Sequence, residues 1–334
     1  MLSEQHPHAI ASLTHQYRMN KHIMLLSNTL IYENRLRCAN EQVANKSLDI
    51  PSMDTLWKHC HDTHSSVKSS DEYRCSGQEG DICWLGQVAD PERSVVFVDT
   101  DNVPAHEMHA GNTIRNPTEA LFVRQLTEAL ISGGIVEDDI GIISVYRSQL
   151  KVLSRLFRHR PLLDIHTVDR YQGKDKDCVI VSLVRSNNNQ EVGELLKDWR
   201  RINVAFTRAK KKLVVFGSRQ TLQGSPIFEK FLNLMHQQDW ILRLPPSAQH
   251  HHPGLTQFGQ LSSASTRRSG RSLSVVGEGG SDDEEEPDKE NSLLDSIVNE
   301  NKAPQSRKEP KVMRAKEEVL LKGLPIMKNI YDGL

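Results

Sequence analysis

Four short apolar runs, rich in valine and isoleucine, constrain the fold more than any other feature of this 334-residue chain. They are SVVFVD at residues 94–99, IGIISV at 140–145, CVIVSLV at 178–184 and LVVFG at 213–217. Such short and uniformly apolar runs are typical of strands buried on both faces of a parallel sheet. Segments with helical periodicity alternate with them, at residues 117–131, 147–158, 195–208 and 227–237. This alternation predicts an α/β domain built on a doubly wound parallel sheet.

Signals at the ends of the first predicted helix support this interpretation. Asn116 stands before residues 117–131 and can accept a hydrogen bond from a backbone N–H that lacks a partner in the first turn. Pro117 suits the first helical position, where a missing N–H has no cost. The glycines at 133–134 mark the end of the helix.

Changes in composition divide the chain into four parts. Residues 94–246 hold the predicted sheet, and residues 1–39 add a first polar and aromatic segment to the same domain. Residues 40–93 are polar, with several histidines and cysteines, and we expect an insertion of loops and short helices there. In residues 247–334, charged blocks such as SDDEEEPDKE replace core residues, which predicts a disordered tail.

The cysteines and the overall charge narrow the class of protein. Five cysteines without repeated spacing favour a reducing compartment over a disulfide framework. Cys60, His64, Cys75 and Cys83 could supply four zinc ligands, but no C-x-x-C pair occurs, so we expect free cysteines and no metal. No apolar run approaches the ~18 residues of a membrane span. With a net charge of −1, binding to nucleic acid would need a local basic surface.

Three polar segments carry the candidate chemistry. They are LTHQYRMN at residues 13–20, IHTVDRYQGKDKDCVIVSLVRS at 165–186 and WRRINVAFTRAKKKLVVFGS at 199–218. In the second segment, Gly173 lies in a polar turn before an apolar strand and lets the backbone come close to a ligand. In the third, the predicted helix would place Arg201 and Arg208 on one face, two turns apart. Guanidinium groups held on a packed helix suit contacts with phosphate oxygens.

In the same order, these segments resemble the later sequence motifs of superfamily 1B helicases. The resemblance rests on QYRM at residues 16–19, TVDRYQGKDKD at 167–177 and NVAFTRAK at 203–210. The longer stretches YRMNKHIMLLSNTLIYENRL and VGELLKDWRRINVAFTRAKKKL are similar to the eukaryotic DNA helicase–nucleases that trim Okazaki-fragment flaps and resect broken DNA ends. The resemblance covers roughly residues 8–245 and implies a RecA-like second motor domain.

This resemblance also implies roles for individual residues. Arg18 and Arg208 would approach the γ-phosphate of ATP as the catalytic arginines. Four residues would lie on the nucleotide side: Tyr17 stacked on the adenine, Gln172 and Gly173 in the turn that couples ATP to the strand, and Asp175 near the ribose, where many relatives have Glu. Four residues would contact single-stranded nucleic acid: Tyr146, Arg147, Gln149 and Thr167.

Simpler structural roles stay open for several of these residues. Arg201 and Arg208 could be solvated charges on a helix, and Tyr17 could be an ordinary, partly buried aromatic residue. Thr167 is of a type favoured in any strand. We expect the lysines at 210–212 at the solvated end of a helix, near its negative dipole, rather than in a nucleic-acid patch.

The sequence lacks the parts that hold most of the nucleotide in a motor ATPase. It contains neither a phosphate-binding loop, G-x-x-x-x-G-K-[ST], nor an acidic pair after an apolar strand that would hold Mg²⁺. ATP with Mg²⁺ would therefore be shared with a first motor domain, and the chain alone should be inactive. The iron–sulfur cluster that the resemblance implies would belong to a nuclease region with no counterpart here. Because Met1 stands shortly before the first motif, we expect a fragment, a truncated gene model or a split product.

The expected function is that of the C-terminal motor domain of an ATP-dependent DNA helicase–nuclease in replication and repair, in the nucleus and also in the mitochondrion. Its partners would be single-stranded or flap DNA and the remainder of the helicase–nuclease polypeptide, while the partner of the tail stays open. Two alternatives also stay open: an RNA helicase of the same superfamily, and a non-catalytic fragment that binds nucleic acid or protein.

Overall fold

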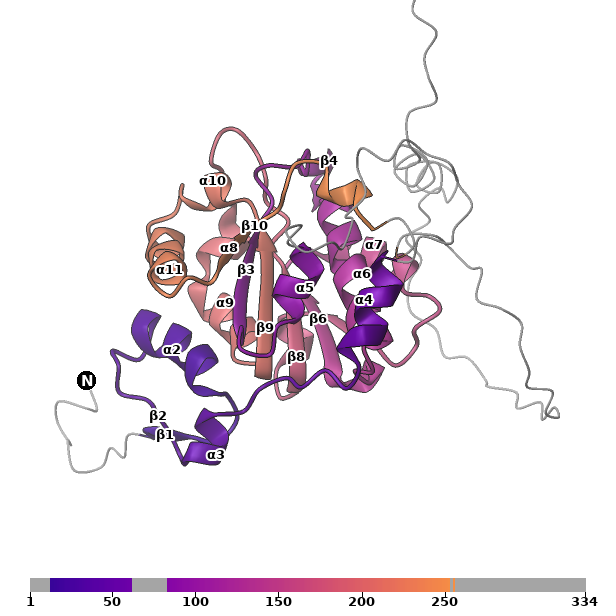
Figure 1. Cartoon of the computed structure of the whole chain (residues 1–334). Coiled ribbons are helices and arrows are strands. Elements are labelled where there is room, and N and C mark those ends of the chain that lie inside the picture. The colour runs from indigo at the N-terminus through magenta and orange to yellow at the C-terminus, as the bar shows by residue number, and fades with distance from the viewer. Residues whose placement is uncertain (1–12, 62–82, 253–254, 256–334) are drawn as a thin grey trace, which may run out of the picture. The chain divides into compact units, whose positions relative to one another are not determined.

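A parallel sheet forms the centre of the molecule (Figure 1). The computed structural model describes residues 13–61, 83–252 and 255, all within one compact unit, Met1–Lys302. Six strands lie in the order β10-β3-β9-β8-β6-β7. Their bounds are β3 Val95–Asp99, β6 Ile140–Ser144, β7 Asp164–Thr167, β8 Lys176–Ser182, β9 Ala209–Gly217 and β10 Ile241–Arg243. Every pairing between them is parallel, which confirms the predicted sheet.

Helices cover both faces of this sheet, because alternate strand residues point to opposite sides. In β3, Val96 and Val98 belong to one hydrophobic core, and Val95 and Phe97 belong to the other. The first core packs against α4 (Met53–His61), α5 (Trp84–Ala89), α6 (Pro117–Ser132) and α7 (Arg147–Leu156) (Figure 1). The second packs against α2 (Lys21–Leu30), α9 (Trp199–Phe206) and α11 (Pro226–Gln237). The fold is therefore doubly wound and RecA-like.

Smaller elements lie at the two edges where the strands begin and end. The carboxyl ends of parallel strands share one edge, which adjoins α10 (Arg219–Leu222) and the hairpin of β4 (Met108–Ala110) and β5 (Thr113–Arg115) (Figure 1). The opposite, amino edge adjoins α2, with β1 (His15–Gln16) and β2 (Arg37–Cys38) beside it. The remaining elements are the short α-helices α3 (Glu41–Ala44) and α8 (Glu194–Lys197) and the 3₁₀ helices η3 (Glu137–Asp139), η4 (Asp169–Tyr171) and η5 (Ala248–His250).

The predicted start of α6 is confirmed in detail. The side chain of Asn116 caps the helix by accepting a hydrogen bond from the backbone N–H of Glu119 over 2.9 Å. Pro117 occupies the first turn, and Gly133 ends the helix. Both α6 and α7 begin at the residue that the sequence indicated, Pro117 and Arg147.

The helix predicted over residues 195–208 is wrong in its extent. The chain forms α8 and then α9, which ends at Phe206 with Thr207 as its cap. Arg208 therefore lies in the turn after the helix and does not share a helix face with Arg201. The Arg201 side chain instead lies 3.4 Å from Asp169 and 3.8 Å from Asp198, in a partly solvated ion pair.

The lysines at 210–212 are in β9 and not at a helix end, which corrects that prediction. Lys212 is almost completely buried, with 1% of its surface exposed. Its ammonium group donates to the carbonyl oxygens of Asp90 at 2.8 Å and Arg93 at 2.7 Å, just beyond the end of α5. Burial lowers the pKa of Lys212 to about 8. This lysine is thus a structural cap and not part of a nucleic-acid surface.

The ends of the predicted insertion and tail belong to the sheet domain. Trp84 in α5 is buried in the first core, although it falls within residues 40–93. Ala248, His252 and Leu255 are buried too, so the packed domain extends past residue 246. The expected disorder of the tail concerns residues outside the described ranges. In the described part of the chain, no helix is long and apolar enough to cross a membrane.

The metal-binding hypothesis is only partly covered by the structure. Cys83 is buried, and its sulfur lies 3.4 Å from Nε2 of His252. His64, Cys75 and the side chain of Cys60 fall outside the described residues. Among residues 13–61, 83–252 and 255, no three His, Cys, Asp or Glu side chains converge as metal ligands would.

Candidate functional site

The first predicted segment is held against the start of β9, at the amino edge of the sheet. The backbone N–H of Asn20 donates to the carbonyl oxygen of Lys210 over 3.0 Å. The Asn20 side chain donates to the carbonyl of Lys211 at 2.8 Å and also caps α2 by accepting from Ile23. Asn20 is buried, so these bonds are shielded from water. They fix the preceding residues, Tyr17 and Arg18, beside the turn that contains Arg208.

Arg18 is oriented from both sides. Its backbone N–H donates to the side-chain oxygen of Gln16 at 3.0 Å. Its guanidinium donates to the carbonyl oxygen of Thr207 at 3.1 Å and lies 3.3 Å from the carboxylate of Asp175. The side chain is about one-third exposed, at 36%. Arg18 is therefore both ordered and accessible, as a phosphate-binding group must be.

Arg208 folds back over the end of α9. Its Nε donates to the carbonyl of Val204 at 2.9 Å, and its terminal nitrogens donate to the carbonyl of Lys174 at 3.3 Å and the hydroxyl of Thr207 at 3.2 Å. Partial burial lowers the pKa of Arg208, the neighbouring charge of Arg18 lowers it further, and Asp175 acts in the opposite direction. The structure thus brings together the two arginines that the sequence singled out.

Asp175 lies among the cations of this site. Its Oδ2 is 3.3 Å from Nε of Arg18, and its Oδ1 is 2.7 Å from Nζ of Lys210. Burial on its own would raise the pKa of Asp175, but Lys210 and Arg18 together hold it below its usual value. The resemblance implies a place near a ribose for this carboxylate. In the structure, it is the counter-ion of two basic side chains.

Tyr17 stands at the surface beside Arg18. Its side chain is among the most exposed large apolar groups of the described residues, at 71%. The backbone is held by a hydrogen bond from Lys46 Nζ to the Tyr17 carbonyl at 3.3 Å. An exposed aromatic ring on a fixed backbone can stack on a flat ligand. The alternative of a partly buried aromatic does not describe this position.

The turn that follows β7 runs from the carboxyl edge of the sheet back to the amino edge. Thr167 ends β7, and Gln172 and Gly173 are exposed in the turn. Gly173 has a φ of +91°, a conformation in which a side chain would be strained. Tyr171, which immediately precedes Gln172, is completely buried. Its ring lies directly over Gly141 of β6, where an added Cβ would come within 2.0 Å of the tyrosine oxygen.

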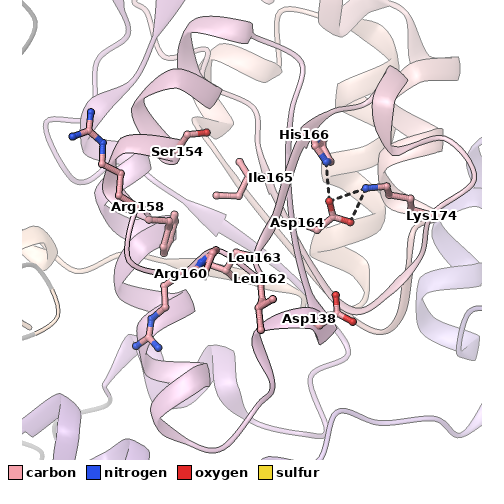
Figure 2. A pocket seen from close by; sticks show the side chains of 12 residues that line it. Asp138, Ser154, Arg158, Arg160, Leu162, Leu163, Asp164, Ile165, His166 and Lys174 are labelled. Carbon is pink, nitrogen blue, oxygen red and sulfur yellow. Dashed lines mark hydrogen bonds and ion pairs between the residues drawn. The ribbon is translucent and has the colours of Figure 1, made fainter. Parts of the chain in front are cut away.

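Asp164, at the start of β7, fixes the far end of this turn. Figure 2 shows His166 and Lys174 converging on its carboxylate, each 2.9 Å away. Lys176 lies 3.9 Å from the same group. Asp164, His166 and Lys174 line one side of a surface pocket of about 610 Å³, whose other side is formed by residues such as Leu162 and Leu163 (Figure 2). The pocket therefore lies against the back of the turn.

At the carboxyl edge, the residues expected to contact nucleic acid behave differently from one another. Arg147 is exposed at the start of α7, and Thr167 pairs with Ser144 of β6, so both lie at the same edge. Gln149 is completely buried, with hydrogen bonds to Asn116 and Ser182. The direct strand contact predicted for Gln149 is therefore corrected to a structural role.

Tyr146 is also largely buried, with 7% of its surface exposed. Its hydroxyl lies close to the guanidinium of Arg185, which partly offsets the rise that burial causes in the pKa of Tyr146. Arg185 in turn lies 3.1 Å from Glu107. The ring of Tyr146 is therefore mostly enclosed by the domain, whereas Arg147 beside it is exposed.

A buried polar network behind this edge was not predicted. The carboxylate of Glu119, in α6, accepts hydrogen bonds from the hydroxyl of Ser182 at 2.5 Å and from the N–H of Val184 at 3.0 Å. Val184 has a φ of +73°, which is unusual for a β-branched residue. Asn116 donates to the carbonyl of Val184 at 3.1 Å. The polar residues at the start of α6 gave the only signal for this network in the sequence.

Comparisons with known proteins agree with this geometry. A family model described as an AAA domain matches residues 1–220. The Schizosaccharomyces pombe DNA replication ATP-dependent helicase/nuclease dna2 is 39% identical over 244 residues, which are 73% of this chain and 16% of the relative. The human DNA2 enzyme of the same description is 42% identical over 243 residues, 72% of this chain and 22% of the relative.

A plant protein shows the same relationship. The Arabidopsis thaliana DNA replication ATP-dependent helicase/nuclease JHS1 is 42% identical over 247 residues, 73% of this chain and 17% of its own length. The chain thus spans less than a quarter of the length of these curated relatives. The residues matched by the family description, 1–220, include all three segments that carry the candidate chemistry. The chain therefore belongs to the AAA domain family matched over residues 1–220, and the relatives named above are DNA replication helicase/nucleases.

Proposed function

We propose that this chain is the second motor domain of an ATP-dependent DNA helicase–nuclease that acts in DNA replication and repair. The observation that carries the proposal is the meeting of Arg18 and Arg208 at the amino edge of the sheet. Arg18 binds the carbonyl of Thr207, the residue before Arg208, although the two segments are far apart in sequence. Two ordered and partly exposed guanidinium groups at one place fit the oxygens of a nucleotide phosphate.

In this function, ATP supplies a phosphoryl group whose oxygens gain negative charge as it is transferred. Arg18 and Arg208 would stabilise that charge as arginine fingers, since a preorganised cation acts most strongly where charge develops. Tyr17, exposed beside Arg18, would stack on the adenine. Mg²⁺ and most contacts with bound ATP would be supplied by a first motor domain, since the sequence offers neither a phosphate-binding loop nor the acidic pair.

The carboxyl edge would hold the single strand of DNA. Arg147 and Thr167 are the strand-facing residues there, with Tyr146 and Gln149 supporting them from within. Gln172 and Gly173, in the turn that returns to the amino edge, would couple the nucleotide to the strand. This turn is held by the buried Tyr171 in its middle and by the ion pair of Lys174 with Asp164 near its end. A turn held in this way can carry a displacement from one edge to the other because it is rigid.

The proposed function extends to the remainder of such an enzyme. Helicase and nuclease parts would belong to one polypeptide with flap or single-stranded DNA as substrate, and any iron–sulfur cluster would lie in the nuclease part. The nucleus, and also the mitochondrion, would be the compartment. RNA helicase activity is less well supported, because the printed names of the relatives refer to DNA replication. A non-catalytic binding fragment would not need the paired arginines.

A chimera can test this proposal. Residues 13–255 of this chain would replace the matching segment of the Schizosaccharomyces pombe relative, and steady-state ATP hydrolysis would be measured with single-stranded DNA and with single-stranded RNA of the same sequence. We expect DNA-stimulated hydrolysis by the chimera and none by the 334-residue chain alone. Equal or better stimulation by RNA would favour the RNA alternative. A well-folded chimera without ATP hydrolysis would favour the non-catalytic one.

A further inference from the structure

The carboxylate of Asp175 lies against Arg18, which the proposed function assigns to phosphate, and against Lys210, which has no role in that function. Each carboxylate oxygen forms an ion pair with a different basic side chain: Oδ2 lies 3.3 Å from Nε of Arg18, and Oδ1 lies 2.7 Å from Nζ of Lys210. All three side chains are about one-third exposed, at 36% for Arg18, 32% for Asp175 and 35% for Lys210. The ion pairs are therefore ordered but open to exchange with an anion from solution.

Asp175 also balances an excess of positive charge at this edge. The side-chain contact with Asp175 raises the pKa of Lys210 above its usual value, and burial opposes that effect. The nearby Arg208 feels repulsion from Arg18 and attraction to Asp175. The neighbouring Asp177 contributes less to Lys210, at 4.0 Å, because it pairs more closely with Lys211 at 2.8 Å. Asp175 thus forms ion pairs with Arg18 and Lys210 and attracts the more distant Arg208.

We propose that Lys210 is a third phosphate-binding cation beside Arg18 and Arg208, and that Asp175 is an internal counter-ion which a polyphosphate displaces. The inference rests on the proposed function, in which these arginines meet nucleotide phosphate. Carboxylate and phosphate oxygens make the same charge-assisted hydrogen bonds to guanidinium and ammonium groups, so one can replace the other. The inference differs from a ribose-binding role, which would make Asp175 favourable for nucleotide binding.

Removing the charge of Asp175 separates these two roles. Binding of inorganic tripolyphosphate to the 334-residue chain would be measured by titration calorimetry at low ionic strength, for the wild type and for Asp175→Asn. We expect Asp175→Asn to bind roughly five- to tenfold more tightly, the effect of removing one competing charge at a partly exposed site. Asp177→Asn is the matched control, since it changes the net charge equally, and its affinity should stay within about twofold.

A second pair of variants tests Lys210. In the Asp175→Asn background, Lys210→Ala should remove most of the gain, whereas Lys211→Ala, one residue further along β9, should leave it. Equal affinity of Asp175→Asn and the wild type for tripolyphosphate, or no measurable binding by Asp175→Asn, would overturn the inference. So would weaker binding of ATP with unchanged binding of tripolyphosphate, because that pattern belongs to a ribose contact.

The proposed function can fail separately from this inference. In the Asp175→Asn background, Arg18→Ala and Arg208→Ala should each weaken tripolyphosphate binding. If neither does, the arginines do not bind phosphate and the proposed function itself is wrong. If both do while Asp175→Asn binds no more tightly than the wild type, the proposed function stands and the counter-ion role is wrong. Thermal unfolding of each variant shows that the fold is kept.

Discussion

The guanidinium of Arg18 donates a hydrogen bond to the backbone carbonyl of Thr207, the residue immediately before Arg208, over 3.1 Å. Thr207 is also the cap of α9, and its hydroxyl donates to the carbonyl of Asn203 at 2.8 Å. The end of one helix therefore sets the positions of both arginines. Because α9 packs into the second core through residues such as Ile202 and Phe206, the arginine pair is supported by the interior of the domain.

Glu119 should make the stability of the domain depend on pH. Burial raises the pKa of Glu119 to about 7, against an ordinary value of 4.5. Between these values the unfolded chain loses the proton and the folded chain keeps it, so the free energy of unfolding falls as the pH rises through this window. Glu119→Gln cannot titrate. Relative to the wild type, it should gain on the order of 2 kcal/mol between pH 5 and pH 8.

Urea denaturation of both proteins at the two pH values measures this difference. Gln keeps an acceptor for Ser182 and Val184, so the variant should fold. Asp99, whose pKa burial raises to about 6, contributes a slope of the same sign in both proteins and cancels in the comparison. An unchanged difference between pH 5 and pH 8 would mean that Glu119 is already ionised in the folded domain.

Gly141→Ala should destabilise the domain and displace the turn after β7. The new Cβ would lie 2.0 Å from the oxygen of Tyr171 and 2.8 Å from Cζ, and the tyrosine side chain is completely buried. Overpacking of this kind costs about 1–3 kcal/mol. Adding Tyr171→Phe removes the closest atom and should restore part of the loss in a thermal or urea melt. No loss in the single variant would show that the ring can shift.

Asp164→Asn should loosen the coupling turn without unfolding the sheet. It weakens the hold on Lys174 and His166, so amide hydrogen exchange should speed up in residues 169–175 but not in β8. In the chimera, more single-stranded DNA should be needed for half-maximal ATP hydrolysis. Asp138→Asn is the control, because Asp138 is 75% exposed and pairs with Lys176 alone at 2.7 Å. The same exchange pattern in both variants would contradict an anchoring role for Asp164.

The sequence predicted the buried strands well and the exposed ones poorly. β3, β6 and the carboxyl-terminal parts of β8 and β9 are apolar runs, which are typical of strands buried on both faces of a sheet. The edge strands β7 and β10 were missed because their residues are mixed in polarity and half-exposed. Such segments become strands only through pairing with neighbours that are distant in sequence, which a local pattern does not contain.

The candidate site shows a similar division. Arg18, Asp175 and Arg208, one from each of the three motifs, lie close to one another in the structure. The prediction for Gln149 from its neighbours in the sequence was wrong: it was expected in a loop that contacts the strand, but its side chain is buried. Its three hydrogen bonds join it to Asn116, which caps α6, and to Ser182 of β8, and only the tertiary structure brings these residues together. Partners separated by more than 30 residues leave no trace in a short window of sequence.

Arg208 offers the sharpest test of the mechanism. In the chimera, Arg208→Ala should reduce ATP turnover at saturating single-stranded DNA by ~10³-fold or more, as for other arginine fingers. Arg208→Lys should rescue little, because a point charge cannot replace the planar fork. Nucleotide affinity should change far less, since the charge develops mainly during transfer. Arg201→Ala removes a partly exposed ion pair on α9 and should have a weaker effect. Turnover of Arg208→Ala within a few-fold of the wild type would make Arg208 a structural cap of α9.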